Sequence, residues 1–203
     1  MNESYYKLGL KQLENLNGKK KILLHSCCAP CSSHVISYLT QYFDITILYY
    51  NPNISPKEEY EKRKAEQIRL IKEIDKVNKI DIIDCDYDND VYESKIKGYE
   101  KCPERGERCT ICFNLRLGKT AKMAKELGYD YFCSTLTVSP YKNSRLINEI
   151  GESLGKEKGI EWLYSDFKKE NGYKHSIELS KKYNLYRQDY CGCKYSVRNK
   201  IND

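Results

Sequence analysis

Five short apolar runs, each separated from the next by a longer polar or charged segment, limit the folds open to this chain. A short apolar run bounded by turn residues is typical of a strand that is buried on both faces. Strands that alternate with helices are typical of a parallel sheet covered by helices on both faces. The sequence therefore predicts a three-layer α/β fold with strands at residues 21–26, 44–50, 80–84, 129–135 and 160–164.

Helix signals lie between these runs. Pro30 can occupy the first turn of a helix, where its missing N–H costs nothing. Gly128 is a suitable residue to end a helix, and Asn143 is a suitable residue to open the next one. The predicted helices span residues 30–42, 55–77 and 109–127, and a further helix begins at residue 143.

The length of 203 residues predicts a single α/β domain over residues 1–203. Residues 1–18 form a helical lead-in, which Asn17-Gly18 ends. Residues 165–203 form a helical C-terminal extension that is interrupted at Tyr190-Cys-Gly-Cys193. No internal repeat and no low-complexity linker divides the chain.

The composition excludes some classes of protein. Apolar residues make up 40% of the chain, and no run of about 18 of them exists, so no transmembrane helix is expected. The first seven residues hold no apolar signal core. We therefore expect a cytoplasmic protein with no membrane partner. Ten cysteines in a reducing compartment favour metal binding or catalysis over a disulfide scaffold.

The net charge of +6 and the 19 tyrosines are compatible with an RNA partner. Basic groups attract phosphates, and tyrosine rings stack on unpaired bases. Many basic proteins bind no nucleic acid, however, and an AT-rich coding bias supplies tyrosine, lysine and isoleucine together. These two features alone leave the partner open.

Cysteines gather in three tight groups that lie far apart in the chain. The groups are Cys27, Cys28 and Cys31; Cys109 and Cys112; and Cys191 and Cys193. In open parallel sheets, ligands bind at the carboxyl ends of the strands. The first group follows the first predicted strand, the second opens a predicted helix, and a loop that ends at Lys142 follows the fourth strand. We expect these segments to meet at one edge of the sheet.

The first two groups suit a thiolate-bound cofactor. A helix N-terminus stabilises thiolates at Cys27, Cys28 and Cys31, and Cys109 and Cys112 form a C-x-x-C pair. A set of four thiolates binds either structural zinc or a 4Fe–4S cluster, and the spacing does not separate the two. A position at the functional edge of an α/β sheet favours an active cofactor.

The third group suits redox chemistry. Gly192 permits the tight backbone that a disulfide between Cys191 and Cys193 would need. Strained disulfides are labile and catalytic rather than structural. The alternative is that the two thiols are additional metal ligands.

The remaining cysteines and the histidines indicate no second site. Cys85 follows a strand and Cys133 lies within one, so both are expected to be structural, whereas the role of Cys102 stays open. His25 is expected to pack beside the first cysteine group. The sequence holds no Walker loop, no GxGxxG after a strand and no HExxH, and cysteines stand where a nucleotide-binding α/β enzyme would have glycines. This pattern argues against the use of ATP.

Polar residues near these groups are candidates for substrate binding. The hydroxyl-rich loop after the fourth strand ends at Tyr141 and Lys142, which can grip a polar ring or a phosphate. The alternative is an ordinary capped loop. Arg105, Arg108 and Arg116 flank the C-x-x-C pair and can meet RNA phosphates, although solvated surface charge is the expected role of each arginine taken alone.

Four motifs follow one another over roughly residues 20–200 of the chain. They are His25-Ser-Cys-Cys-Ala-Pro30, Arg108-Cys-Thr-Ile-Cys-Phe113, Thr135-Leu-Thr-Val-Ser-Pro-Tyr-Lys142 and Tyr190-Cys-Gly-Cys193. In these residues and in this order, the chain resembles the epoxyqueuosine reductases of the QueH type. The combination is specific, because adjacent cysteines, C-x-x-C and C-x-C rarely occur together by chance.

The resemblance implies an oxidoreductase of tRNA queuosine biosynthesis. Such an enzyme acts in the cytoplasm and reduces epoxyqueuosine at the wobble position of tRNA to queuosine, with electrons from an unidentified donor. The sheet and its helices would be like those of the nucleotide α-hydrolase (PP-loop) proteins, with the helical C-terminal extension added.

The resemblance also implies roles for particular residues. Cys27, Cys28, Cys109 and Cys112 match the ligands of a 4Fe–4S cluster. Cys31 lies where a ligand of an adjacent mononuclear iron is expected. Cys191 and Cys193 match a redox-active disulfide. The candidates for substrate contact are Tyr141, Lys142 and Arg116.

Two other classes of protein remain as alternatives. An iron–sulfur-dependent tRNA-thiolating enzyme of the ATP pyrophosphatase type would need a phosphate loop rich in glycine and serine after the first strand. The residues Cys27-Cys-Ala-Pro30 stand there instead. A zinc-binding RNA protein without enzymatic activity would use the same four thiolates for zinc.

Overall fold

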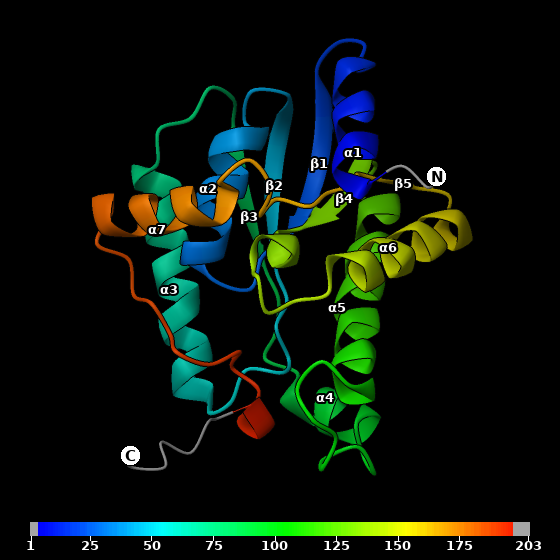
Figure 1. The fold of residues 1–203 in the computed structure, drawn as a ribbon, viewed down its shortest axis with the longest axis vertical. Coiled ribbons are helices and arrows are strands. Elements are labelled where there is room, and N and C mark those ends of the chain that lie inside the picture. Colours follow the sequence, from blue (N-terminus) through cyan, green and yellow to red (C-terminus); the bar gives the residue numbers. More distant parts are fainter. Residues whose placement is uncertain (1–3, 197–203) are drawn as a thin grey trace.

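A five-stranded, wholly parallel sheet forms the centre of the computed structural model, which describes residues 4–196 (Figure 1). The order of the strands across the sheet is β3-β2-β1-β4-β5. Their bounds are Lys20–His25 (β1), Phe43–Tyr49 (β2), Ile80–Asp84 (β3), Tyr131–Ser134 (β4) and Glu161–Trp162 (β5). The predicted α/β fold with a parallel sheet is confirmed.

The apolar content of each strand follows its position in the sheet. Ile22, Leu23 and Leu24 of the central strand β1 are fully buried, because helices cover both faces of the sheet there. The edge strand β3 is less buried, and its Asp81 and Asp84 are exposed. Charged side chains on an edge strand discourage pairing with another chain.

Helices cover the two faces in two groups (Figure 1). The chain passes from β1 to β3 through α2 (Ala29–Leu39) and α3 (Lys57–Glu73), and then returns to β4 and β5 through α5 (Glu107–Glu126) and α6 (Ser144–Lys158). Because crossovers between parallel strands are right-handed, the two directions place the two pairs of helices on opposite faces. Helix α7 (Gly172–Lys182) packs against α2.

Both ends of α6 carry residues that are typical of helix termini. The Asn143 side chain accepts a hydrogen bond from the backbone N–H of Leu146 at 3.2 Å. At the other end, Gly159 has φ 66°, the left-handed conformation that closes a helix with little strain in glycine. The predicted start of this helix at residue 143 is confirmed within one residue.

Two further α-helices precede β1 and α5, and a 3-10 helix at Thr135–Val138 follows β4. Helix α1 (Tyr5–Glu14) falls within the predicted lead-in and begins at the capping residue Ser4. Helix α4 (Asn89–Lys95) lies in the segment before α5, where the sequence predicted no helix. None of the helices described over residues 4–196 has the length and apolar character needed to cross a membrane.

The C-terminal part differs from the predicted helical extension. Within residues 165–196 the structure has one α-helix, α7, and a single 3-10 turn at Lys194–Ser196. Residues 183–193, which we call the C-terminal strap, form no helix and run alongside α3 (Figure 1). The portion of the prediction at residues 197–203 lies outside the described residues.

Side chains of α3 explain why the C-terminal strap is not helical. Arg69 donates to the carbonyl oxygen of Asn184 at 3.1 Å, and Glu66 accepts from the backbone N–H of Tyr186 at 2.8 Å. Arg63 makes similar bonds nearer the end of the strap. Backbone groups that a helix would pair internally are therefore paired with another element. The periodicity of the strap alone does not reveal these partners.

The strand order reverses direction between β1 and β4. The connection after β1 leads to α2 on one face, and the connection after β4 leads to α6 on the other face. A crevice forms at such a point because the two loops diverge from adjacent strands. The first cysteine group and the loop that ends at Lys142 follow these two strands.

Candidate metal and redox site

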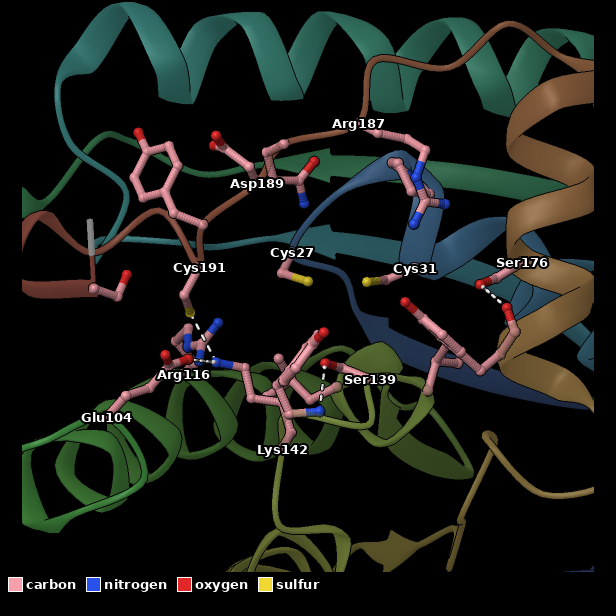
Figure 2. Close-up of a pocket in the computed structure, with 18 residues that line it drawn as sticks. Cys27, Cys31, Glu104, Arg116, Ser139, Lys142, Ser176, Arg187, Asp189 and Cys191 are labelled. Carbon is pink, nitrogen blue, oxygen red and sulfur yellow. Dashed lines mark hydrogen bonds and ion pairs between the residues drawn. The ribbon is translucent and has the colours of Figure 1, made fainter. Parts of the chain in front are cut away.

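A pocket lies at the carboxyl ends of β1 and β4, where the strand order reverses (Figure 2). Segments that are distant in sequence line it: the turn after β1, the loop after β4 and the C-terminal strap, with further residues from α5, α7 and the segment before α5. The lining residues that carry reactive or polar groups include Cys27, Cys31, Glu104, Arg116, Ser139, Tyr141, Lys142, Tyr173, Arg187, Asp189, Tyr190 and Cys191. The expected meeting of the first cysteine group and the loop that ends at Lys142 at one edge of the sheet is confirmed, and the C-terminal strap joins them there.

The first cysteine group forms a compact set of sulfurs at the start of α2. The Sγ atoms of Cys27, Cys28 and Cys31 all lie within 4.8 Å of one another, and those of Cys27 and Cys28 are 3.7 Å apart. Cys28 is the N-cap of α2, and Pro30 lies in the first turn as predicted. The three thiols are therefore held by a strand, a tight turn and a helix start.

Proton sharing within this group favours one thiolate. The pKa of the Cys27 thiol is lowered well below its usual range because Cys28 and Cys31 donate hydrogen bonds to its sulfur. The pKa of Cys31 is raised because it is one of those donors and because it is buried. A thiolate is the form of cysteine that binds a metal.

The second cysteine group lies on α5. Cys109 and Cys112 are three residues apart and therefore project from the same side of the helix. They lie outside the compact sulfur set of the first group but line an adjoining pocket with Cys191 and Cys193. The two pockets share Arg116 and other residues, so all three cysteine groups border one continuous region.

Arg116 lies between the first two cysteine groups. Its side chain is only 1% exposed, and its Nε donates to the carbonyl oxygen of Cys112 at 3.3 Å. Its Nη2 has no hydrogen-bond partner among the described residues, and the guanidinium lines both pockets. Burial opposes its charge, but Cys112, Cys191 and Cys27 favour it. The expected role as solvated surface charge is wrong for this residue.

Arg108 also differs from that expectation, for another reason. It is 2% exposed, and its Nη1 donates to the carbonyl oxygens of Tyr99, Glu100 and Cys102. Arg108 thereby folds the segment before α5 onto the helix. Of the three arginines, Arg105 alone is exposed as predicted.

The third cysteine group places its two sulfurs in different surroundings. The Lys142 ammonium donates to Cys191 Sγ at 2.9 Å, whereas Cys193 Sγ lies 3.1 Å from the hydroxyl of Tyr92 (Figure 2 shows Cys191 and Lys142). Both thiols are free, and neither is in a disulfide with another described cysteine. Gly192 between them has φ 103°, a backbone conformation that glycine adopts with little strain. This agrees with the tight backbone that the sequence predicted at Gly192.

The loop after β4 brings two further candidates to the pocket. Lys142 is largely buried and also lies 3.7 Å from a carboxylate oxygen of Glu104. Tyr141 is 51% exposed and lines the pocket as well. The three predicted substrate-binding residues, Tyr141, Lys142 and Arg116, therefore lie around the same pocket.

The histidine beside the first cysteine group has a structural position. His25 is fully buried, with Nδ1 2.9 Å from Ser134 Oγ and Nε2 3.2 Å from the Tyr50 carbonyl oxygen. Burial, and then the charge of Arg116, lower the pKa of His25 to about 3, so the ring is neutral. Its predicted packing role is confirmed, since it ties the ends of the strands around the pocket together.

The other three cysteines lie away from the lining of these pockets. Cys133 is fully buried in β4, as predicted. Cys85 is half-buried after β3 and packs against the main core, in keeping with a structural role. Cys102 contributes its carbonyl oxygen to Arg108.

Sequence reasoning missed three residues that shape this region. They are Arg63, Tyr92 and Glu104, which contact or adjoin the third cysteine group. Tyr92 and Arg63 lie on separate helices about 100 residues or more before the cysteines, and nothing local marks them. A local signal did exist for Arg116, because it follows Cys112 by four residues on a helix and so lies on the same side.

The donor set fits a thiolate-bound metal centre. Thiols from two segments border one region, three of them form a compact group, and an arginine with an unpaired N–H lies between the segments. A buried cation next to thiolates offsets the negative charge that such a centre carries. Both iron–sulfur clusters and zinc accept thiolate donors of this kind.

The fold and the site define an α/β protein with a cysteine-rich site, suited to binding a metal, at the point where its strand order reverses. The family model for "Epoxyqueuosine reductase QueH" matches residues 22–199. This chain belongs to the QueH family.

Relatives of known sequence support this membership. The "Epoxyqueuosine reductase QueH" of Streptococcus pyogenes serotype M1 is 44% identical over 190 residues, which cover 93% of this chain and 74% of the relative. The protein of the same name from Staphylococcus epidermidis is 44% identical over 192 residues, with coverages of 93% and 81%. That from Thermotoga maritima is 32% identical over 182 residues, with coverages of 87% and 90%.

Proposed function

We propose that this protein is an epoxyqueuosine reductase, which removes the epoxide oxygen of epoxyqueuosine in tRNA to give queuosine. Membership of the QueH family supports this function. The observation that supports it is the meeting of three cysteine groups around two adjoining pockets that share Arg116, Lys142 and Cys191. A tRNA substrate implies that the enzyme acts in the cytoplasm, with electrons from a donor that is still to be identified.

The cofactor that suits this chemistry is a 4Fe–4S cluster. Cys27, Cys28, Cys109 and Cys112 would hold it, because they supply four thiolates from the two segments that border Arg116. When bound, such a cluster supplies electrons to the reaction. Cys31 would be a ligand of an adjacent mononuclear iron, since its sulfur belongs to the compact group and also lines the pocket.

Opening an epoxide leaves negative charge on its oxygen, so positive groups in the pocket favour the reaction. Arg116 and Lys142 line the pocket, and the unpaired Nη2 of Arg116 is available to donate a hydrogen bond. Because both groups are largely withdrawn from water, their charge acts more strongly on a bound oxygen.

Oxidation of the third cysteine group to a disulfide would release as many electrons and protons as the removal of the epoxide oxygen consumes. Two thiols that close to a disulfide release two electrons and two protons. Removal of an epoxide oxygen as water, with formation of an alkene, consumes two electrons and two protons. Cys191 and Cys193 would act as this redox pair, and Cys191 reaches the pocket directly.

The tRNA substrate would approach through the exposed rim of the pocket. Tyr141 and Tyr173 lie among the lining residues, and aromatic rings stack on bases that are turned out of an RNA loop. Arg187 adds a positive charge at the same rim, which suits a phosphate backbone. Tyr141, Lys142 and Arg116 would therefore be the principal contacts to the modified nucleoside and its surroundings.

The function is tested with anaerobically purified, cluster-loaded protein and tRNA that carries epoxyqueuosine. Mass spectrometry of the digested nucleosides should show conversion to queuosine when a chemical reductant is supplied. Cys112→Ser should abolish conversion, whereas Cys85→Ser, outside the pockets, should leave it intact. Persistence of epoxyqueuosine with fully loaded protein would refute the proposal.

The identity of the bound metal distinguishes an epoxyqueuosine reductase from a zinc-binding RNA protein. Elemental analysis of the anaerobic protein should give iron and sulfide, together with the broad absorption of a thiolate-bound cluster. Colourless protein with stoichiometric zinc would contradict the cofactor and the redox function together.

A further inference from the structure

The two sulfurs of the C-x-C motif lie in contrasting surroundings. Cys191 is half-buried, lines the pocket and accepts a hydrogen bond from Lys142 at 2.9 Å. Cys193 is 6% exposed and belongs to a small buried cluster with Tyr92, Ile96 and Cys112. One sulfur can therefore be reached from solvent through the pocket, and the other faces the interior beside the second cysteine group.

We propose that Cys191 is the sulfur that exchanges with an external thiol reductant, that Cys193 is its internal partner, and that Lys142 and Tyr92 hold these two sulfurs in their separate roles. The inference rests on the proposed redox function of the pair. It specifies which of the two sulfurs reacts with the reductant, and it names two residues that contact the reacting sulfurs.

Lys142 holds a positive charge against the Cys191 sulfur. Burial lowers the pKa of the Lys142 ammonium, but the charge and the hydrogen bond of the Cys191 sulfur outweigh burial, so the pKa of Lys142 is raised. The nearest carboxylate, that of Glu104, lies further away at 3.7 Å. A fixed cation beside a cysteine stabilises its thiolate, which is the nucleophilic form.

Tyr92 acts on Cys193 as a hydrogen-bond donor. Its hydroxyl lies 3.1 Å from Cys193 Sγ, and a phenol donates a hydrogen bond to a thiolate at that distance. Burial raises the pKa of the Cys193 thiol, and the hydrogen bond from Tyr92 opposes that rise, so the departing Cys193 thiolate keeps one donor although it is remote from Lys142. Exchange is faster when the departing sulfur is better stabilised.

The backbone around the pair is fixed from α3, so the two environments are not interchangeable. Arg63 donates to the carbonyl oxygen of Cys191 at 3.2 Å, and the backbone N–H of Ser55 donates to that of Gly192 at 2.9 Å. With both carbonyls held, Cys191 stays at the pocket and Cys193 stays against Tyr92.

The exchange step balances with an external dithiol as the only co-reactant. One thiolate of the dithiol attacks Cys191 Sγ of the disulfide; the sulfur–sulfur bond breaks, and Cys193 leaves as a thiolate beside the Tyr92 hydroxyl. The second thiolate of the reductant attacks its own sulfur in the mixed disulfide, and Cys191 leaves as a thiolate beside Lys142. The dithiol is oxidised to a disulfide, and the protein pair gains the two electrons.

Two single variants trap the exchange at one sulfur. Cys193→Ser and Cys191→Ser proteins, cluster-loaded and anaerobic, are incubated with oxidised glutathione, and mixed disulfides are located by peptide mass spectrometry. Glutathione should attach to Cys191 in Cys193→Ser at least about tenfold faster than to Cys193 in Cys191→Ser. Equal rates, or faster attachment to Cys193, would overturn the inference.

Further variants separate the roles of the two neighbours. In the Cys193→Ser background, Lys142→Met should slow modification of Cys191 by roughly tenfold, and Lys142→Arg should restore most of the rate because it keeps the charge. Tyr92→Phe should leave this rate unchanged, because Tyr92 contacts the other sulfur. A Cys191 rate that Lys142→Met does not change would refute the role of Lys142.

The wild-type protein distinguishes failure of the inference from failure of the proposed function. Oxidised glutathione should convert Cys191 and Cys193 to an internal disulfide. A pair that never forms this disulfide contradicts the proposed redox function and the inference with it. A pair that forms it, but whose trapped mixed disulfide lies on Cys193, contradicts the inference alone.

Discussion

The guanidinium of Arg63 donates to the carbonyl oxygen of Cys191 at 3.2 Å and so joins the middle of α3 to the C-terminal strap. Arg63 is only 2% exposed, and its Nε is paired with Glu59 at 2.6 Å. The position of the C-x-C pair therefore depends on a helix that contributes no cysteine to the site.

Arg63→Met should destabilise the protein by about 2–4 kcal/mol, because it leaves the strap carbonyls without their donor and leaves Glu59 with the Tyr186 hydroxyl but no cation. It should also reduce turnover, because Cys191 loses its fixed position at the pocket. Urea unfolding and nucleoside mass spectrometry measure the two effects.

Arg69→Met is the matched control for this variant. Arg69 lies on the same helix and also bonds the strap, but at Asn184, far from the cysteines, and it is more exposed. It should cost about 1 kcal/mol and leave turnover nearly unchanged. An equal loss of turnover in both variants would show that Arg63 has no special role at the pair.

Gly192→Ala should disturb the site more than a similar change elsewhere. Gly192 has φ 103°, and an added Cβ would lie 2.9 Å from Ile54 Cγ1 and 3.0 Å from Arg63 Nη1. Gly98 has a comparable φ of 90° but has open space around the same position, so Gly98→Ala isolates the backbone strain. Both should lose about 1–2 kcal/mol from strain.

Only Gly192→Ala should also lose turnover, because it pushes the strap away from Arg63. Thermal unfolding gives the stability of both variants, and single-turnover assays give their activity. Normal turnover in Gly192→Ala would show that the conformation between the two cysteines does not matter.

Arg116→Gln should lower the rate of epoxide reduction on the order of 100-fold or more, because it removes a buried positive charge from the pocket. The exposed residue Arg105 provides the control, and Arg105→Gln should retain activity. Iron content is measured on both proteins, so that loss of the cofactor can be separated from loss of rate. A fully loaded Arg116→Gln protein with normal turnover would contradict a role in the reaction.

Acid should destabilise the protein partly through His34 of α2. Burial, and then the nearby His175, lower the pKa of His34 from 6.5 to about 4; the Nδ1 atoms of the two rings are 3.0 Å apart. Between these two pH values the unfolded chain binds a proton here that the folded protein does not. Stability is therefore fully present above pH 6.5 and is lost as the pH falls towards about 4.

His34→Gln should remove this part of the pH dependence. Because the ring is partly exposed, its share is about 1–2 kcal/mol between about pH 7 and pH 4. Urea midpoints at the two pH values measure the effect in both proteins. The same decrease in the variant and in the wild-type protein would show that His34 does not contribute.

The sheet could be predicted from the sequence because strands that are buried on both faces consist mostly of apolar residues. Ile22, Leu23 and Leu24 are consecutive apolar residues because helices cover both faces of β1. The cysteine groups were found for a similar reason: close spacing is visible locally, and the fold class indicated the edge at which they meet.

Contacts between distant segments could not be predicted in the same way. Tyr92 and Arg63 meet the C-x-C motif only because α4, α3 and the strap come together in the fold. From the sequence alone, Arg116 is expected to be exposed, because a charged residue on a helix usually is. Its burial is explained by the thiols that surround it in the fold. The helical extension predicted over residues 165–203, with its break at Tyr190-Cys-Gly-Cys193, was wrong over residues 183–189 because polar groups of α3 pair with the backbone there.

The attachment of the C-terminal strap has a consequence for the order in which the protein matures. Most of its polar anchors lie on α3 and around residue 55, whereas the first two cysteine groups are carried by β1, α2 and α5. A segment whose anchors lie outside the sheet can open without unfolding the sheet, because proteins open in local units. We therefore expect the proposed cofactor to enter while the strap is detached and the sheet is already folded, and the closing strap then to cover the region that the three cysteine groups border.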